Sequence, residues 1–170
     1  DLNRVQYTEW SYGAKNKAIT LYMGTQIHDP SYSKLEARNM LQISQNENVI
    51  TNVSAIEPIK GIDLIIKSVA LLKQKGLNVL FAHLGGLRGD TDEQQQYADS
   101  LKHLVQELGV EDNIIWLGRR NDISDILSFA DCYVHPSWTE GLPSALMEAA
   151  MAGLPLIATR AGGMPEIVKN

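Results

Sequence analysis

From residue 48 onward, short apolar stretches alternate with longer amphipathic ones, and this alternation restricts the chain to few folds. Strands are predicted over residues 49–55, 77–84, 113–117, 132–135 and 156–158. Helices are predicted between them, over residues 61–75, 91–108 and 123–129 and along the tract after residue 143. Apolar strands joined through helices form a parallel sheet covered on both faces. We therefore expect an α/β fold, a Rossmann-like domain with a doubly wound parallel sheet.

The residues before this alternation have a different character. Residues 1–17 are polar and irregular, and we interpret them as a linker remnant. A strand is predicted over residues 18–23. A short helix is predicted over residues 33–41, with Ser33 as its N-cap and Glu36 completing a capping box.

Length and composition exclude several classes of protein. A chain of 170 residues corresponds to one domain, which we assign to residues 48–170, with residues 1–47 as linker and leading segment. The net charge of −5 argues against a nucleic-acid partner, because neutralising phosphates needs clustered Lys and Arg. The sequence has no apolar run long enough for a membrane span and no signal peptide. Cys132 is the only cysteine, and we expect a buried, inert thiol. These features fit the cytoplasm.

The tract at residues 137–155, SWTEGLPSALMEAAMAGLP, carries the most informative side chains. Pro143 pre-sets the first turn of a helix, and residues with strong helix propensity follow it. A helix this apolar is expected to be buried, which makes its one charge, Glu148, conspicuous. A second carboxylate, Glu140, precedes the helix. Between them lies a helix N-terminus that favours an anion, so the order of groups fits a sugar, a diphosphate and a ribose.

The predicted sheet gathers further candidates at one edge. Rossmann-like sheets bind ligands at the carboxyl ends of their strands, near the switch in strand order. Four loops meet there, over residues 57–61, 85–90, 118–122 and 137–143. Apart from the 137–155 tract, the candidates in these loops are Lys60, Gly85, Gly86, Gly118 and Arg119.

Each candidate also has a plainer structural explanation. Glu148 could pair with a buried arginine, and Glu140 could be a solvated loop carboxylate. Lys60 could be a surface lysine. Arg119 could be one of two solvated loop arginines. The glycines after the strand at 77–84 follow a G-G-x-x-G spacing that differs from the dinucleotide fingerprint, so we disfavour a nicotinamide cofactor.

The histidines do not indicate a metal site. His28, His83, His103 and His135 show no metal-ligand spacing with one another or with Cys132, and we expect no metal. Of the four, His135 ends a predicted strand, just before Pro136, at the predicted ligand edge. It could touch a ligand or be a structural histidine.

The segment from residue 131 to residue 168, DCYVHPSWTEGLPSALMEAAMAGLPLIATRAGGMPEIV, resembles the core of the retaining GT-B glycosyltransferases with a Glu-x7-Glu signature. The resemblance extends to residues 114–131 and to residues 56–72. It implies that this chain is the carboxyl-terminal, donor-binding half of a GT-B enzyme that transfers a sugar from a nucleoside-diphosphate sugar, of UDP type, to an acceptor. The amino-terminal acceptor domain would belong to the same full-length enzyme, which could be peripheral at a membrane. The chain alone is expected to be inactive.

The resemblance also assigns roles to the candidates. It implies that Glu148 receives the ribose hydroxyls and that Glu140 orients the transferred sugar. Lys60 would act on the leaving diphosphate, in place of a metal or other cofactor. The groups that hold the diphosphate with it would be Gly141, Leu142, Pro143 and Ser144. Gly85 and Gly86 would permit close approach of the ligand, and Gly118 with Arg119 would lie near the base.

One position departs from the family pattern. The family commonly has an arginine five residues before the lysine, and here that position is Ala55. Arg119 or Arg88 could replace it, Lys60 and the helix N–H groups could suffice, or activity could be weakened. The alternatives are a non-catalytic nucleotide-sugar binding module, or another GT-B enzyme such as a sugar epimerase or a phosphorylase.

Overall fold

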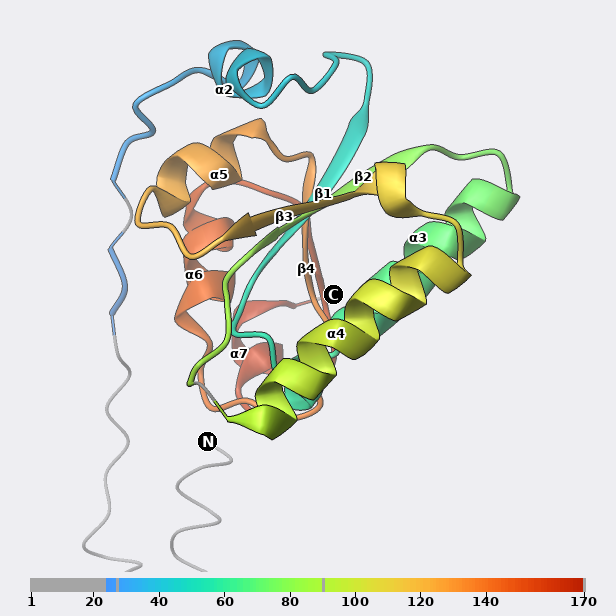
Figure 1. The fold of residues 1–170 in the computed structure, drawn as a ribbon. Coiled ribbons are helices and arrows are strands. Elements are labelled where there is room, and N and C mark those ends of the chain that lie inside the picture. Colours follow the sequence, from blue (N-terminus) through green and yellow to red (C-terminus); the bar gives the residue numbers. More distant parts are fainter. Residues whose placement is uncertain (1–23, 27, 90, 170) are drawn as a thin grey trace, which may run out of the picture.

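The computed structural model describes residues 24–26, 28–89 and 91–169. The predicted strand over residues 18–23 and the linker before it lie outside this part of the chain. Within it, a five-stranded parallel sheet is covered by helices on both faces (Figure 1). The prediction of a Rossmann-like α/β fold is confirmed.

The five strands follow the prediction closely. They are β1 (Asn48–Val53), β2 (Val79–Leu84), β3 (Ile114–Gly118), β4 (Cys132–His135) and β5 (Leu156–Ala158). Their order across the sheet is β3-β2-β1-β4-β5. Asn48 pairs in register with Val79 on one side of β1, and Ile50 pairs with Cys132 on the other. The chain order therefore reverses between β1 and β4, where such sheets bind ligands.

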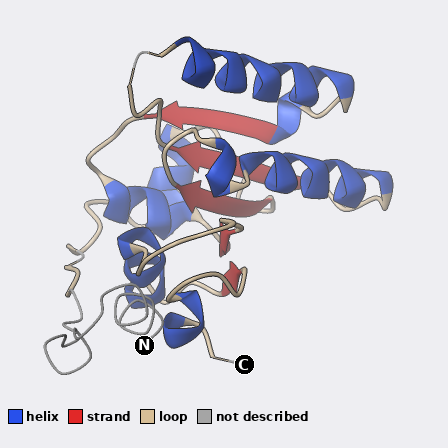
Figure 2. Ribbon diagram, turned by 90° about the horizontal axis from the view of Figure 1, so that it is seen from below, coloured by secondary structure: helices blue, strands red, loops and turns tan. Residues whose placement is uncertain are grey.

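The helices connect these strands across the two faces. They are α2 (Lys34–Met40), α3 (Ile62–Gln74), α4 (Asp92–Glu107), α5 (Ile123–Phe129), α6 (Ser144–Met151) and α7 (Met164–Ile167). The predicted capping box is present, because Ser33 and Glu36 exchange hydrogen bonds at the start of α2. The two long helices, α3 and α4, run alongside the strands in Figure 2. Within the described residues, none of these helices has the length and apolar character needed to cross a bilayer.

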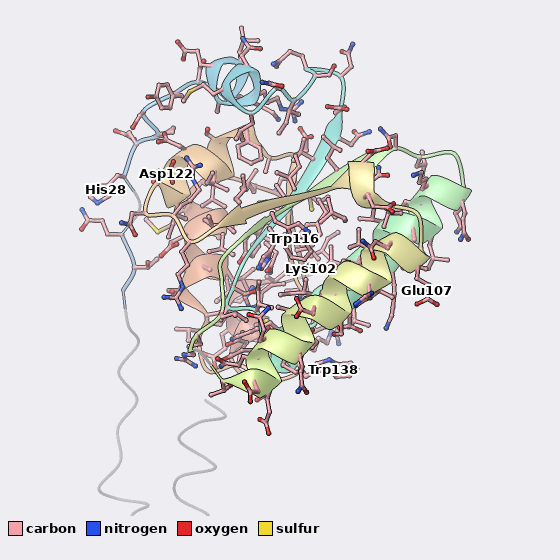
Figure 3. All side chains as sticks on the ribbon, viewed as in Figure 1. His28, Lys102, Glu107, Trp116, Asp122 and Trp138 are labelled. Atoms are coloured by element: carbon pink, nitrogen blue, oxygen red, sulfur yellow. The ribbon has the colours of Figure 1, made fainter. Side chains whose placement is uncertain are left out.

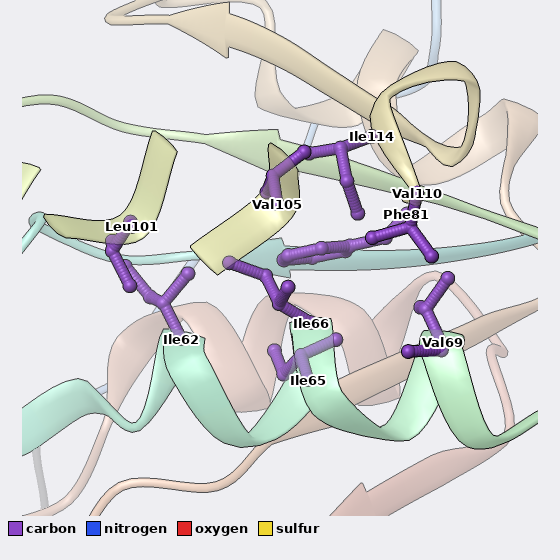
Figure 4. Packing of buried hydrophobic residues seen from close by; sticks show 10 residues of the cluster. Ile62, Ile65, Ile66, Val69, Phe81, Leu101, Val105, Val110 and Ile114 are labelled. Atoms are coloured by element: carbon purple, nitrogen blue, oxygen red, sulfur yellow. The ribbon is translucent and has the colours of Figure 1, made fainter. Parts of the chain in front are cut away.

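Alternate side chains along the strands pack into two separate hydrophobic cores, on opposite faces of the sheet. On β2, Phe81 points to the cluster formed with α3 and α4, which includes Ile62, Ile66 and Leu101 (Figure 4). Its neighbours Leu80 and Ala82 point to the opposite cluster, with α2 and α5. Because the two cores hold β1 and β2 from both sides, the loops at the ends of these strands start from a rigid base.

Helix α6 is less buried than its composition predicts. Leu146 and Ala149 are buried against β4, β5 and α7, but Met151 is 55% exposed. The expectation of a buried helix is therefore wrong for its outer face, because α6 packs on the sheet through one side only. Cys132 is likewise half-buried, and desolvation raises the pKa of its thiol.

Helix α2 is fixed to the fold by a buried arginine. Arg38 is 2% exposed and donates to the carbonyl oxygens of Phe129 (3.0 Å) and Glu47 (3.0 Å). Its Nη2 also donates to Asp131 Oδ2 at 2.7 Å. This network ties α2 to the segment between α5 and β4.

Candidate functional site

The centre of the candidate site is an ion pair between two loops that are far apart in sequence. Lys60 ends the short 3-10 turn Pro58–Lys60 after β1, and its Nζ donates to Glu140 Oε1 at 2.7 Å. Glu140 lies on the loop between β4 and α6. The backbone joins the same loops, because Trp138 N–H donates to the Ile59 carbonyl at 2.9 Å. In Figure 3, Trp138 lies at the lower end of the fold. The ion pair thus bridges the point where the strand order reverses.

Glu140 has a second buried partner. His135 Nε2 lies 2.9 Å from the same Oε1 atom, and His135 is 2% exposed. Burial alone would raise the pKa of Glu140, but hydrogen bonds from His135 and Lys60, with help from the Ser137 hydroxyl and the Lys60 charge, lower it to about 2. Glu140 is therefore ionised at neutral pH and can only accept hydrogen bonds.

A tyrosine lies behind His135. Tyr133 is fully buried, and its hydroxyl lies 3.1 Å from His135 Nδ1. The same hydroxyl is 3.3 Å from the Val53 carbonyl at the end of β1. Tyr133, His135 and Glu140 thus form one chain of polar contacts from the sheet interior to the site.

A cavity of about 260 Å³ opens beside the ion pair. Glu140 and Lys60 line it together with Arg88 and with Ser144 from the first turn of α6. The N-cap of α6 is Pro143, which provides no side-chain hydrogen bond to the first N–H groups of the helix. Glu57 also lines the cavity, so its two cations are balanced by two carboxylates. The feature that suits an anion is therefore the helix N-terminus with its N–H groups.

A second cavity of about 400 Å³ adjoins the first. Five residues line both, so the two cavities form one groove. The shared residues are Val53, Ser54, Ala55, Ser144 and Ala145. Gly85, Gly86 and Arg119 line only the second cavity. The groove therefore runs from the ion pair, past the α6 N-terminus, to the loops after β2 and β3.

Two glycines let the loops approach closely enough to form this groove. Gly85 has a φ of +146°, and a Cβ there would lie 1.8 Å from the Ser54 carbonyl oxygen. Gly162 has a φ of +54°, and a Cβ there would lie 1.7 Å from the Glu140 carbonyl oxygen. Any side chain at either position would push the neighbouring loop away.

Glu148 lies one turn beyond Ser144 on α6, on the side that faces the groove. Its Oε1 accepts a hydrogen bond from Thr25 Oγ1 at 3.2 Å. The alternative that Glu148 pairs with a buried arginine is not what the structure has. A small hydroxyl on the leading segment occupies one of its oxygens instead.

The groove brings most of the predicted site residues together. Glu140, Lys60, Pro143, Ser144, Gly85, Gly86 and Arg119 line it. Gly141, Leu142 and Gly118 do not line it but adjoin lining residues in the chain, and Glu148 is not among the lining residues. Gly141 is held there by its carbonyl, which accepts from Gly163 N–H at 2.7 Å.

Sequence reasoning missed three groups of the site. Val53 and Ser54 line both cavities, and their position at the carboxyl end of a predicted strand was the signal that could have identified them. Tyr133 carried no such signal, because its side chain is buried within β4. In the described part of the chain, the acidic, histidine and cysteine side chains form no cluster that could hold a metal ion.

A parallel α/β sheet with a groove at the switch in its strand order is the arrangement of Rossmann-like domains. The family model described as "Glycosyl transferases group 1" matches residues 33–170. The chain belongs to this family.

Curated relatives agree with this assignment. D-inositol 3-phosphate glycosyltransferase of Corynebacterium glutamicum is 32% identical over 133 residues, which is 76% of this chain and 31% of that protein. Lipopolysaccharide glucosyltransferase WaaG of Escherichia coli is 30% identical over 129 residues, which is 75% of this chain and 32% of that protein. The chain spans about a third of the length of these relatives.

Solved structures share the fold. Anabaena HepE, crystallised with UDP and glucose, superposes with a TM-score of 0.73 at 27% identity, covering 81% of this chain and 36% of that one. WaaG superposes with a TM-score of 0.69 at 27% identity, covering 84% and 35%. The prediction of a GT-B glycosyltransferase domain is confirmed.

Proposed function

We propose that this chain is the donor-binding part of a glycosyltransferase that uses a nucleoside-diphosphate sugar, of UDP type, and retains the configuration of the transferred sugar. The observation that carries the proposal is the Lys60–Glu140 ion pair (2.7 Å) in a groove headed by the uncapped N-terminus of α6. HepE was crystallised with UDP-glucose, and its likeness to this chain supports a UDP-type donor. The acceptor would bind to another part of a longer enzyme.

We assign the groove as follows. The diphosphate lies at the start of α6, against residues 141–144, where Lys60 is near and where the N-cap, Pro143, gives the first N–H groups of the helix no side-chain partner. The ribose hydroxyls donate to Glu148, and the base extends toward Gly118 and Arg119. Gly85 and Gly86 line this end of the groove and let the ligand approach the backbone. Glu140 accepts a hydroxyl of the transferred sugar through Oε2, because both Lys60 and His135 bond to Oε1.

Arg88, on another loop, supplies the positive charge that the family's arginine would provide at position 55, where this chain has Ala55. Ala55 lines both cavities, and Arg88 lines the first cavity together with Lys60. The Arg88 side chain is 77% exposed, and its Nη1 is 4.0 Å from Glu57 Oε1, so little holds it in place. It is therefore free to turn toward a diphosphate in the groove.

Lys60 acts on the charge that grows on the leaving diphosphate. A fixed ammonium there stabilises the transition state more than the ground state, so this role needs neither a metal nor another cofactor. The assignment of residues 48–170 as the donor-binding unit stays a prediction. We place the enzyme in the cytoplasm, where it could work at a membrane surface.

Calorimetric titration of the 170-residue chain with UDP and UDP-glucose tests the proposal. Glu148→Ala should lower the affinity for both ligands at least tenfold, because charge-assisted hydrogen bonds to the ribose are lost. Glu107→Ala, an exposed carboxylate at the far end of α4 (Figure 3), is the matched control and should leave binding unchanged. Equal binding by the parent chain and Glu148→Ala would exclude Glu148 from the site.

A further inference from the structure

Tyr133 is buried where a phenylalanine would fill the same space. It belongs to the cluster with Leu127, Leu146 and Ala149 and is fully inaccessible. Its ring stacks on His135, with centroids 5.9 Å apart and planes at 20°. The hydroxyl is therefore the feature that packing alone does not explain, and burial raises the pKa of this phenol so that it keeps its proton.

The proton positions along the chain of contacts follow from Glu140. Glu140 is ionised and only accepts, so the Nε2 atom of His135, 2.9 Å away, must carry a proton and donate it. A neutral ring with its proton on Nε2 presents a lone pair at Nδ1. The Tyr133 hydroxyl lies 3.1 Å from Nδ1. It accepts a hydrogen bond from Val53 N–H at 3.4 Å, and the Val53 carbonyl, at 3.3 Å, competes with Nδ1 for its single proton. We assign the proton to the nearer acceptor, Nδ1, because that nitrogen has no other donor in the described structure.

The neutral ring is also the form that suits the local charges. Lys60 Nζ lies 2.7 Å from Glu140 Oε1 and already neutralises this carboxylate. A positively charged His135 would add a second cation to the same oxygen inside a protein interior, where uncompensated charge is costly. Glu148 and Arg88 are the next charged groups around the groove, and the structure gives neither of them a contact with His135.

We propose that Tyr133 is a positioning residue for the donor site: its O–H donates to Nδ1 of His135 and holds the ring as the tautomer that donates from Nε2 to Glu140. In the groove without a ligand, Glu140 is thereby held from two directions, by Lys60 from the β1 loop and by His135 from β4. His135 is the partner that stays when Lys60 turns to a diphosphate. This inference rests on the proposed function, because it concerns the carboxylate that orients the transferred sugar. Loss of the Tyr133 hydroxyl should therefore weaken contacts to the transferred sugar and leave contacts to the nucleotide unchanged.

The first test is spectroscopic and needs no ligand. Nitrogen-15 correlation spectra of the histidine rings in the 170-residue chain should show His135 neutral, with its proton on Nε2. In Tyr133→Phe the Nδ1 partner is lost, so the Nδ1 resonance should shift and the other tautomer should become detectable. Tyr97→Phe, which removes a hydroxyl in the α3–α4 cluster, should leave the His135 signals unchanged. A charged His135, or one with its proton on Nδ1, in the parent chain would overturn the proposal.

The second test separates positioning from general stability. Tyr133→Phe should bind UDP as the parent does and bind UDP-glucose about three- to tenfold more weakly, which corresponds to one lost hydrogen bond. Equal weakening for UDP and UDP-glucose would point to a structural role and contradict the proposal. If neither ligand binds the parent chain while the tautomer is as expected, the proposed function fails and the proton arrangement stands.

Discussion

Gly162 lies against the backbone of Glu140, so close that a Cβ atom at position 162 would be 1.7 Å from the Glu140 carbonyl oxygen. Gly162 precedes α7, and Glu140 is on the loop before α6. The turn before α7 therefore fixes the position of the loop that carries Glu140, the carboxylate of the candidate site.

Gly162→Ala should displace this loop and lower the affinity for UDP-glucose by more than tenfold. Gly153→Ala is the matched control, since Gly153 also has a left-handed backbone, with a φ of +75° against +54°, but has nothing within 4 Å of a Cβ. Both variants should lose about 1–2 kcal/mol from backbone strain. Only Gly162→Ala should lose ligand affinity in calorimetry, and equal binding by the two variants would contradict this.

Lys60→Met should separate an enzyme from a binding module in the longer parent protein. If Lys60 stabilises the leaving diphosphate, turnover should fall by about 10²–10³ while donor affinity falls less. Steady-state kinetics with donor titration checks this, with the exposed Lys67→Met as the control. Normal turnover in Lys60→Met would exclude the catalytic role, and a parent that binds the donor without transferring it would favour the binding module.

Arg38→Met should lower the free energy of unfolding without changing any residue that lines the groove. The substitution leaves the Phe129 and Glu47 carbonyls without their buried donor, while Asp131 keeps Lys34 and Val49 N–H as partners. A buried acceptor left without its partner costs about 1–3 kcal/mol. Lys67→Met removes an exposed pair with Asp63 and should cost less than about 0.5 kcal/mol. Urea unfolding measures both, and a small loss in Arg38→Met would show that α2 is not held by this side chain.

His83 should make the stability depend on pH. It is fully buried on β2, both ring nitrogens lack a partner within the described chain, and burial lowers its pKa from 6.5 to about 4. The unfolded chain takes up the proton near pH 6.5 and the folded one only near pH 4. Stability is therefore full above pH 6.5 and falls as the pH drops toward 4, by about 2 kcal/mol at pH 5.

His83→Phe removes the group that takes up this proton. Urea unfolding at pH 7.5 and pH 5 should show a smaller loss for His83→Phe than for the parent. His103→Gln, an exposed histidine on α4, should behave as the parent. If His83→Phe loses as much stability at pH 5 as the parent, another group controls the acid response.

The fold could be predicted because each strand and helix has a recognisable local sequence pattern. Helix α5 and strands β4 and β5 begin and end at the predicted residues, and Thr91 caps α4 as expected, through its hydroxyl and Gln94 N–H. The order of the strands was not predictable in the same way, because it depends on which distant stretches pair across the sheet. The outer face of α6 was mispredicted for the same reason: composition does not say how many sides of a helix are covered.

The sequence pointed to residues that the structure places along one cavity, while their role in binding a donor stays a prediction and their mutual contacts were not foreseen. Glu140, Lys60 and Ser144 were identified and line one cavity. The bond between Lys60 and Glu140 joins residues 80 positions apart, which no local pattern foretells. The contact of His135 with the same oxygen depends on the path of the chain after β4. The Thr25 contact with Glu148 had no sequence signal, because a single hydroxyl in a loop has many possible partners.

The Lys60–Glu140 ion pair couples the two ends of any donor that binds here. With no ligand, each charge already satisfies the other, so a free diphosphate must compete with Glu140 for the ammonium. A complete donor brings a sugar hydroxyl that gives Glu140 a new partner as Lys60 turns to the phosphates. Binding of the whole donor should then be tighter than its separate halves would suggest, and the empty groove should discriminate against nucleotides that lack a sugar.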